Sequence, residues 1–207
     1  MLIKLMEKDL LLESLKKQGL STEIISAFEN VKREKFVPEN MVGYAYSDLA
    51  LPIESGASIS QPSTVAFMLS LLELKPKQKV LEIGSGSGYA LALISNIIKE
   101  GEVFGLELNK RLAIKSTNIL FEDKNIKIFN REGSSGLPKS SPFDRIIISA
   151  ACPDMRIPLN LMEQLNDPGI MVAAVKQSIV QLKKENGKLI QKEFPGFAFV
   201  QLRREEE

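Results

Sequence analysis

Three glycines at alternate positions follow an apolar run near the middle of the chain. Gly84, Gly86 and Gly88 lie in residues 80–89 (VLEIGSGSGY), and a helical pattern begins at Tyr89. Because glycine has no Cβ, a ligand can lie directly against the backbone of such a loop. The N-terminus of the following helix favours negative charge on that ligand. The pattern therefore predicts a binding loop between a buried strand and a helix; a glycine-rich turn without a ligand is the alternative.

The glycine spacing and a neighbouring acid narrow the class of ligand. Dinucleotide-binding loops read G-x-G-x-x-G, whereas here the third glycine comes one position early. Glu82, just before the loop, would repel a pyrophosphate and attract a cation. S-adenosylmethionine carries an ammonium and a sulfonium, together with a carboxylate that can face the loop amides. These features predict a site for this methyl donor and for its product, S-adenosylhomocysteine, rather than for NAD.

A second acid has the position expected of a ribose ligand. Glu107 ends residues 103–107 (VFGLE), 23 positions after Gly84. In nucleotide-binding α/β folds, an acid about 20 residues beyond the first glycine binds the ribose hydroxyls. We predict this role for Glu107; a solvated acid at a strand end is the alternative.

The composition excludes several classes of protein. The 207 residues fit one domain, or one domain with an extension, and 27 basic residues nearly balance 26 acidic ones. This balance gives no nucleic-acid-binding footprint, and no apolar run is long enough for a membrane span. The single cysteine, Cys152, excludes an internal disulfide, so we expect a reducing compartment, the cytoplasm.

The chain contains no histidine. This removes the commonest general base, the serine–histidine triads and histidine metal ligands, and we expect no metal. Any chemistry must therefore proceed without an imidazole.

The hydrophobic pattern alternates between helical and strand periods. Helices are expected over residues 2–18, 21–30, 62–74, 89–99, 109–121 and 158–165, with an irregular stretch at 48–62. Strands are expected at 79–83, 102–107, 126–130, 145–149 and 170–175, then a hairpin of 179–184 and 188–194, and a last strand at 197–202. Strands separated by helices predict an α/β fold whose sheet is mostly parallel, with helices on both faces and antiparallel C-terminal strands. Rossmann-like class I S-adenosylmethionine-dependent methyltransferases have this organisation.

Five further segments match elements of one family. They are R-x-x-F-V-P at 33–38, Y-x-D-x-x-L-P-I at 46–53, I-S-Q-P at 59–62, L-E-I-G-x-G-S-G-Y at 81–89, and PFDRIII at 142–148 with AACP at 150–153. From about residue 30 to 202, the chain resembles the protein-L-isoaspartate (D-aspartate) O-methyltransferases. The glycine loop is shared by all class I methyltransferases, whereas I-S-Q-P is far more specific.

The resemblance implies methyl transfer from S-adenosylmethionine to the α-carboxylate of L-isoaspartyl residues in damaged peptides and proteins, a repair reaction. A carboxylate with a pKa of about 4 is already ionised at neutral pH, so no general base is needed. Ser60 is the expected catalytic residue because its hydroxyl can orient the carboxylate, with Ser58 and Ile59 as further substrate contacts. A helix-capping serine just before Pro62 is the alternative. Asp48 is expected to stabilise its loop.

The resemblance also implies the donor contacts and the organisation of the chain. The contacts are Glu82, Gly84, Ser85, Gly86, Gly88, Glu107, Leu108, Glu132 and Gly133. Glu132, where the family has an aspartate, is expected to accept a hydrogen bond from the adenine amine. Residues 1–75 are expected to hold the N-terminal helices and the substrate-side loop, and 76–207 the methyltransferase domain, in one compact unit. The expected partners are isoaspartyl peptides and proteins, with no nucleic acid or membrane, and the expected state is a monomer.

Two departures from the family pattern leave alternatives open. Residues 54–60 read ESGASIS, so Glu54 replaces a glycine and Ala57 a glutamine. A carboxylate at position 54 would oppose a carboxylate substrate if it faced the pocket. The alternatives are a catalytically altered S-adenosylmethionine-binding protein of the same fold, or a methyltransferase for another substrate. A nucleic-acid methyltransferase is disfavoured because residues 149–153 lack an N/D-P-P-Y/F turn.

Overall fold

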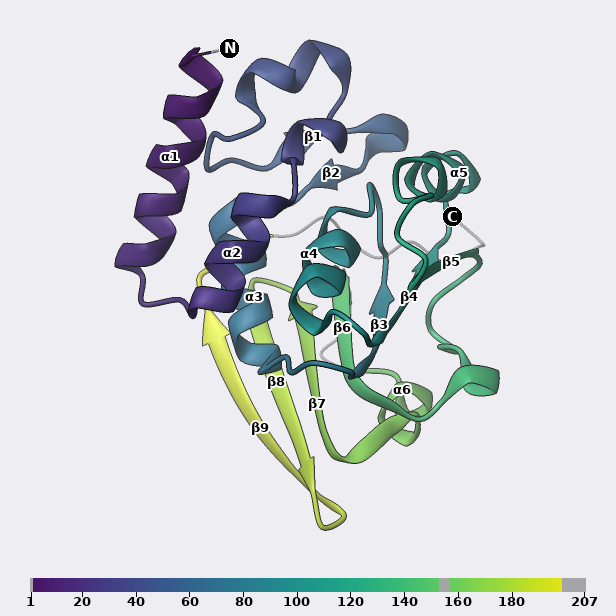
Figure 1. Ribbon diagram of the computed structural model, residues 1–207. Helices are drawn as coiled ribbons and strands as arrows, with labels where there is room; N and C mark the ends of the chain where they lie inside the picture. The colour runs from purple at the N-terminus through teal and green to yellow at the C-terminus, as the bar shows by residue number, and fades with distance from the viewer. Residues whose placement is uncertain (1, 153–156, 199–207) are drawn as a thin grey trace.

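A computed structural model describes residues 2–152 and 157–198, and within them seven strands form one sheet (Figure 1). Its order is β5-β4-β3-β6-β7-β8-β9. The strands are β3 (Lys79–Ile83), β4 (Glu102–Glu107), β5 (Ile126–Asn130), β6 (Phe143–Cys152), β7 (Leu165–Val175), β8 (Ser178–Glu185) and β9 (Lys188–Pro195). The first five in this order are parallel, and β8 and β9 continue the sheet antiparallel to β7. The fold expected from the sequence is confirmed.

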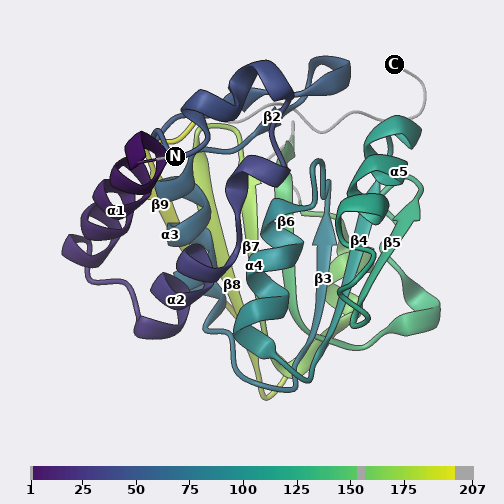
Figure 2. The same ribbon diagram turned by 45° about the horizontal axis from the view of Figure 1, so that its top comes forward.

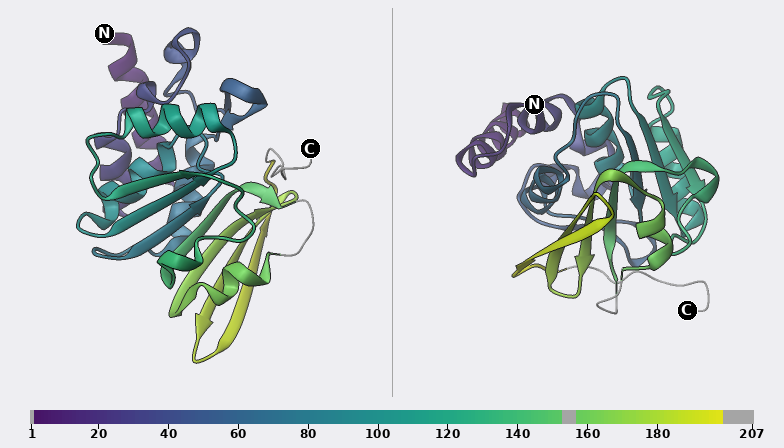
Figure 3. Two further views of the ribbon diagram at one scale, coloured as in Figure 1. Left: turned by 90° about the vertical axis from the view of Figure 1, so that its right-hand side faces the viewer. Right: turned by 90° about the horizontal axis from the view of Figure 1, so that it is seen from below.

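Six α-helices lie within the same residues: α1 (Leu2–Lys17), α2 (Thr22–Asn30), α3 (Pro62–Leu72), α4 (Tyr89–Ile98), α5 (Lys110–Ile119) and α6 (Leu159–Glu163). Two have side-chain caps at the first residues of the ranges expected for them: Ser21 accepts the amide of Ile24, and Asn109 accepts those of Arg111 and Leu112. Figure 2 shows α2, α3 and α4 together over one face of the sheet, and Figure 3 shows α6 on the other side. No helix of the described part of the chain is long and apolar enough to cross a membrane.

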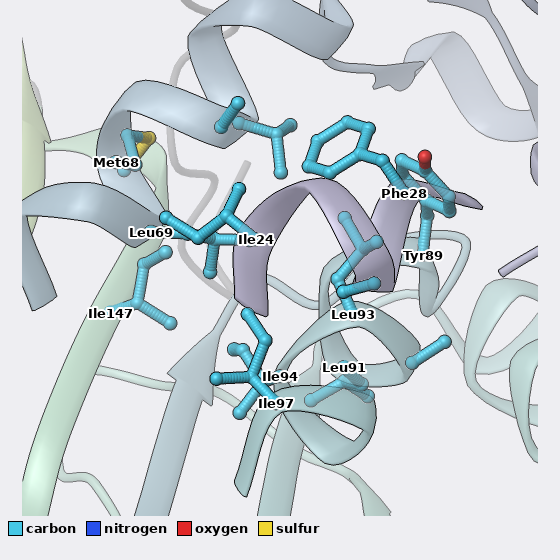
Figure 4. Close-up of a cluster of buried hydrophobic side chains, with 14 of the residues drawn as sticks. Ile24, Phe28, Met68, Leu69, Tyr89, Leu91, Leu93, Ile94, Ile97 and Ile147 are labelled. Carbon is cyan, nitrogen blue, oxygen red and sulfur yellow. The ribbon is translucent and has the colours of Figure 1, made fainter. Parts of the chain in front are cut away.

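Alternate residues of the central strands serve two separate cores. On β3, Val80 packs with the helices of the α4 face, whereas Leu81 and Ile83 belong to the cluster around α6. A strand covered on both faces must be largely apolar, which is why consecutive residues of β3 (Val80 and Leu81) and of β6 (residues 146–148, III) are hydrophobic. Figure 4 shows the larger cluster, in which Ile24 of α2 lies beside Leu69 of α3 and Phe28 of α2 beside Tyr89 of α4. The N-terminal helices and one face of the sheet therefore share the larger of the two cores.

Three expectations need correction or stay open. The stretch 48–62, expected to be irregular, contains a two-stranded antiparallel ribbon of β1 (Leu51–Pro52) and β2 (Ser58–Ile59). It also contains the 3₁₀ turn η3 (Glu54–Gly56). Strand β7 begins at Leu165, five residues earlier than expected, because Leu165 pairs with Phe143 across an interruption in register. Of the expected strand at 197–202, Phe197 and Ala198 are not in a strand, and the rest lies outside the described residues.

Candidate active site

A cavity of about 1100 Å³ opens at the carboxyl ends of β3, β4 and β6. Its walls come from the ribbon and the start of α3, from the glycine loop, from the β4–α5 turn, from the end of β6 and from residues 196–198. Strand β3 lies between β4 and β6, so the chain leaves it on one side and returns on the other. Such a switch point leaves a crevice outside the strand ends, where ligands of open α/β sheets bind.

The glycine loop needs its glycines for two different reasons. Gly84, Gly86 and Gly88 have φ angles of +75°, +51° and +85°, which residues with a Cβ rarely adopt. A Cβ on Gly84 would meet Ala150 Cβ at 3.0 Å, and one on Gly88 would meet Leu120 Cδ1 at 2.9 Å. A Cβ on Gly86 would have a single neighbouring atom within 4 Å, Ile53 Cδ1 at 4.0 Å. The outer glycines therefore allow close packing, while Gly86 keeps open the side that lines the cavity.

Glu107 is a buried acid of the cavity wall and not a solvated strand end. Its Oε2 accepts the amide of Gly86 at 2.7 Å, and its Oε1 accepts the amide of Asn109 at 2.8 Å. The carboxylate thereby ties the glycine loop to the β4–α5 turn. This arrangement excludes the solvated alternative; contact with a ribose stays a prediction.

Glu82 has one partnered and one unpartnered oxygen. The carboxyl is 1 % exposed, its Oε1 accepts the Ser149 hydroxyl at 2.5 Å, and its Oε2 has no hydrogen-bond partner. Burial raises the pKa of Glu82 to about 8, which the Ser149 hydrogen bond opposes and the charge of Glu107 reinforces. A buried carboxyl with an unused oxygen at a cavity wall fits a cationic ligand group, because an unpaired buried charge is costly.

The remaining predicted donor contacts are divided between the cavity wall and other positions. Ser85, Leu108 and Gly133 line the cavity, whereas Gly88 and Glu132 are not among its lining residues. The Glu132 carboxylate accepts both the amide and the hydroxyl of Ser134, at 2.8 and 2.7 Å. The Glu132 carboxylate is therefore hydrogen-bonded within its own turn. Its hydrogen bond to adenine stays a prediction.

The substrate-side residues Ser58, Ile59 and Ser60 all line the cavity. Helix α3 is capped at Gln61 without a side-chain hydrogen bond, so Ser60 is not a helix cap and that alternative is wrong. Asp48 serves the helix instead: it accepts the amide of Ser63 at 2.8 Å and the side-chain amide of Gln61 at 3.1 Å. The expected loop-stabilising role of Asp48 is confirmed.

The two residues that differ from the family pattern, Glu54 and Ala57, occupy different environments. Ala57 lines the cavity, whereas Glu54 is exposed and its carboxylate pairs with Lys115 of α5 at 2.6 Å. The Lys115 ammonium holds the pKa of Glu54 below its usual value. Glu54 therefore places no carboxylate in the cavity, and its side chain connects the ribbon segment with α5.

Sequence reasoning missed three residues. Ser149 and Tyr89 line the cavity, and Arg33 donates from Nη2 to the Ser60 carbonyl at 2.9 Å from behind it. Ser149 had one usable signal, its place at the carboxyl end of a buried strand. Arg33 had only its position at the start of the R-x-x-F-V-P element. Of the AACP segment expected after the buried strand, the Cys152 side chain and Pro153 lie outside the described residues.

Comparisons of the sequence with known proteins point to one family. The family model described as Protein-L-isoaspartate(D-aspartate) O-methyltransferase (PCMT) matches residues 6–207. A protein-L-isoaspartate O-methyltransferase of Thermosipho melanesiensis is 39% identical over 197 residues, covering 92% of this chain and 98% of the relative. One of Roseobacter denitrificans is 40% identical, covering 85% of each chain, and one of Methanopyrus kandleri is 38% identical, covering 96% and 92%.

Solved structures agree with the sequence relatives. A protein-L-isoaspartate O-methyltransferase superposes with a TM-score of 0.85 at 25% identity; 94% of this chain matches 65% of that longer chain. A putative protein-L-isoaspartate O-methyltransferase from Plasmodium falciparum, in complex with S-adenosyl-L-homocysteine, gives a TM-score of 0.82 at 26% identity, covering 95% and 98% of the two chains.

Proposed function

The chain belongs to the protein-L-isoaspartate (D-aspartate) O-methyltransferase family, and we propose how its own residues perform that family's reaction. It is an S-adenosylmethionine-dependent enzyme that methylates the α-carboxylate of L-isoaspartyl residues in damaged proteins. One observation carries the assignment to this cavity: a buried acid with an unused oxygen and the serine of the I-S-Q-P element line the same space.

The residues of the glycine loop suit the donor. When bound, S-adenosylmethionine supplies a methyl group activated by its attachment to a sulfonium. The unused oxygen of Glu82 would accept a hydrogen bond from a cationic group, and the open space at Gly86 would leave room for the donor against the loop. Glu107, already aligned by two backbone amides, would accept the ribose hydroxyls. Ser85, Leu108 and Gly133 complete this half of the wall.

The ribbon supplies the acceptor half of the site. Ser60 would donate a hydrogen bond from its hydroxyl to one oxygen of the isoaspartyl α-carboxylate. The adjoining Ser58 and Ile59 would hold the flanking peptide. The carboxylate is ionised at neutral pH, so these groups need only orient it and exclude water. This division of labour fits a chain without histidine.

The alternative of a catalytically altered donor-binding protein loses its main support. It depended on a carboxylate at position 54 facing the pocket, and Glu54 pairs with Lys115 outside it. Ala57 removes an amide from the wall but adds no charge. The proposal therefore keeps the family's substrate.

We further propose that the enzyme works as a cytoplasmic monomer on isoaspartyl peptides and proteins. Its single cysteine is suited to a reducing compartment, and the near-zero net charge of +1 gives no electrostatic preference for nucleic acid. Light scattering coupled to gel filtration measures the oligomeric state directly, and a dimer would contradict the proposal.

The function is tested with two peptides that differ only at one linkage. Purified protein is incubated with S-adenosylmethionine labelled in its methyl group and with either an L-isoaspartyl peptide or its normal L-aspartyl isomer. We expect base-labile methyl ester on the isoaspartyl peptide alone. Tight donor binding without methylation of either peptide would restore the altered-protein alternative.

A further inference from the structure

Arg33 is a fully buried cation directly behind the substrate-side serine. It begins the 3₁₀ turn η1 (Arg33–Lys35) and is 0 % exposed. Its Nη2 donates to the Ser60 carbonyl at 2.9 Å, while Nε and Nη1 have no hydrogen-bond partner. Its guanidinium carbon lies 4.8 Å from the centre of the Tyr89 ring, and both Ser60 and Tyr89 line the cavity. Arg33 therefore joins the two halves of the site from behind the wall.

Within the described residues this charge is offset only in part, by the attraction of Asp48, which forms no ion pair with it. The nearby acids are occupied elsewhere: Glu34 accepts the Tyr46 hydroxyl, and Asp48 caps α3. No ion pair of the described residues includes Arg33. Burial lowers the pKa of Arg33, which the adjacent Tyr89 opposes. What offsets the loss of water around this cation is one carbonyl, the Tyr89 side chain and the attraction of Asp48.

A second buried arginine shows how a structural guanidinium is accommodated in this protein. Arg145 of β6 is 7 % exposed, and all three of its nitrogens donate to backbone carbonyls, those of Leu72, Asp144 and Glu73. Arg33 has one such bond. A purely structural role would not need a buried charge with two unused donor nitrogens, because an unsatisfied buried donor costs stability.

An arriving carboxylate would supply the missing negative charge. Arg33 contacts the carbonyl of Ser60, and the serine hydroxyl is the group proposed to meet the substrate, so cation and carboxylate would lie on two sides of one residue. In a partly desolvated site, charges a few ångströms apart attract far more strongly than they do in water. The same field stabilises a neutral carboxamide much less, because that group presents a dipole and no net charge.

We propose that Arg33 is a specificity-determining and positioning residue whose buried charge, which has no ion-pair partner and is held against the Ser60 carbonyl, makes the acceptor pocket select a carboxylate over its neutral counterpart. This inference rests on the proposed function, because it needs the acceptor to bind at Ser60. It adds that carboxylate selection comes from a buried charge behind the wall as well as from the serine hydroxyl.

The test measures binding, not turnover. Dissociation constants are determined by calorimetry in the presence of S-adenosylhomocysteine for an L-isoaspartyl peptide and for the same peptide with its α-carboxylate replaced by a carboxamide. Wild-type protein, Arg33→Met, Arg33→Lys and the matched control Arg145→Met are compared. We expect Arg33→Met to reduce the preference for the carboxylate about 10- to 100-fold, the effect of one charge in a partly desolvated site. Arg33→Lys, which keeps the charge, should retain part of the preference, and Arg145→Met all of it.

Two outcomes would overturn the inference. If Arg33→Met weakens both peptides equally, or keeps the wild-type preference, Arg33 is structural and the proposed function stands. If wild-type protein binds neither peptide, the proposed function fails and this inference fails with it. Should Arg33→Met not fold, Arg33→Gln replaces it, because glutamine keeps a hydrogen-bond donor without the charge; a wild-type preference in that variant overturns the inference equally.

Discussion

Ser60 lines the cavity and has no structural task in the helix that follows it, since Asp48 caps α3. Replacing Ser60 by alanine should therefore lower methyl transfer to an isoaspartyl peptide by about 10- to 150-fold, the effect of losing one hydrogen bond to a charged group. Donor affinity and melting temperature should stay near their wild-type values. Single-turnover rates and thermal unfolding on the same sample measure both quantities.

Asp48→Ala provides the opposite control. It removes the cap of α3 and should lower the free energy of unfolding by about 1 kcal/mol. A Ser60→Ala protein that loses stability like Asp48→Ala, yet turns over normally, would contradict the assigned role of Ser60.

Glu82 should make the donor-free protein depend on pH in an unusual direction. Burial raises its folded-state pKa to about 8, from a usual value of 4.5. Because the folded-state pKa is the higher one, the stability that this group contributes is fully present below the usual value and is lost as pH rises through the folded one. The melting temperature should accordingly fall across this window, and Glu82→Gln should flatten the decline. Equal pH profiles for the two proteins would refute this assignment.

The same carboxyl should couple donor binding to proton release. A cationic donor favours ionised Glu82, so below pH about 8 binding should release a proton and tighten as pH rises. Calorimetry in two buffers with different ionisation enthalpies detects the proton, and Glu82→Gln should abolish the buffer dependence.

At the residue scale, spacing located some groups and tertiary packing placed others. Glu107 follows the glycine loop at a recognisable distance, and the structure holds it against Gly86. Arg33 has no such relation, because its contacts with Ser60 and Tyr89 join segments that are distant in sequence. The position of Glu132 predicts a contact with adenine, which stays a prediction, and in the structure its carboxylate accepts hydrogen bonds from Ser134.

Among the elements, the turn into α4 depends on Gly88 most directly. Gly88→Ala would force a Cβ into a φ of +85° and against Leu120 and Ser116 at 2.9 and 3.1 Å. We expect a loss of about 2–4 kcal/mol in the free energy of unfolding, from backbone strain and overpacking together, and weaker donor binding. Chemical denaturation and donor titration measure the two effects.

The matched control is Gly187→Ala in the β8–β9 hairpin. Its φ of +73° imposes similar strain, but nothing lies within 4 Å of the added carbon. It should cost about 1–2 kcal/mol and leave donor affinity unchanged. Equal losses of stability in the two variants would show that packing against α5 contributes nothing.

Element positions were predictable wherever an apolar period was long. Strands β3 and β4 and helix α4 begin where the pattern places them, because their periods are uninterrupted. The sequence predicts that β7 begins at residue 170, because residues 165–169 (LNDPG) have the composition of a loop. Pairing with β6 extends the strand to Leu165. The ribbon β1–β2, two residues in each strand, is too short to leave any periodicity.

At the scale of the whole molecule, we propose that residues 1–75 and 76–207 unfold as one unit. Phe28 of α2 packs edge-on against Tyr89 of α4, with ring centres 6.0 Å apart, and Leu69 and Leu93 belong to the same buried cluster (Figure 4). Calorimetry should therefore show one transition with equal calorimetric and van't Hoff enthalpies. Two resolved transitions, or a stable fragment lacking residues 1–30, would contradict the proposal.

The central claim is methyl transfer to an isoaspartyl carboxylate in the cavity at Ser60. Its most direct test is a competition in one vessel: an equimolar mixture of a peptide in its L-isoaspartyl and L-aspartyl forms, with donor limiting, analysed by chromatography and mass spectrometry. The wild-type enzyme should place the methyl group on the isoaspartyl form alone, and Ser60→Ala should do so far more slowly. Methyl ester on both forms in proportion to their amounts, or on neither, would contradict the account.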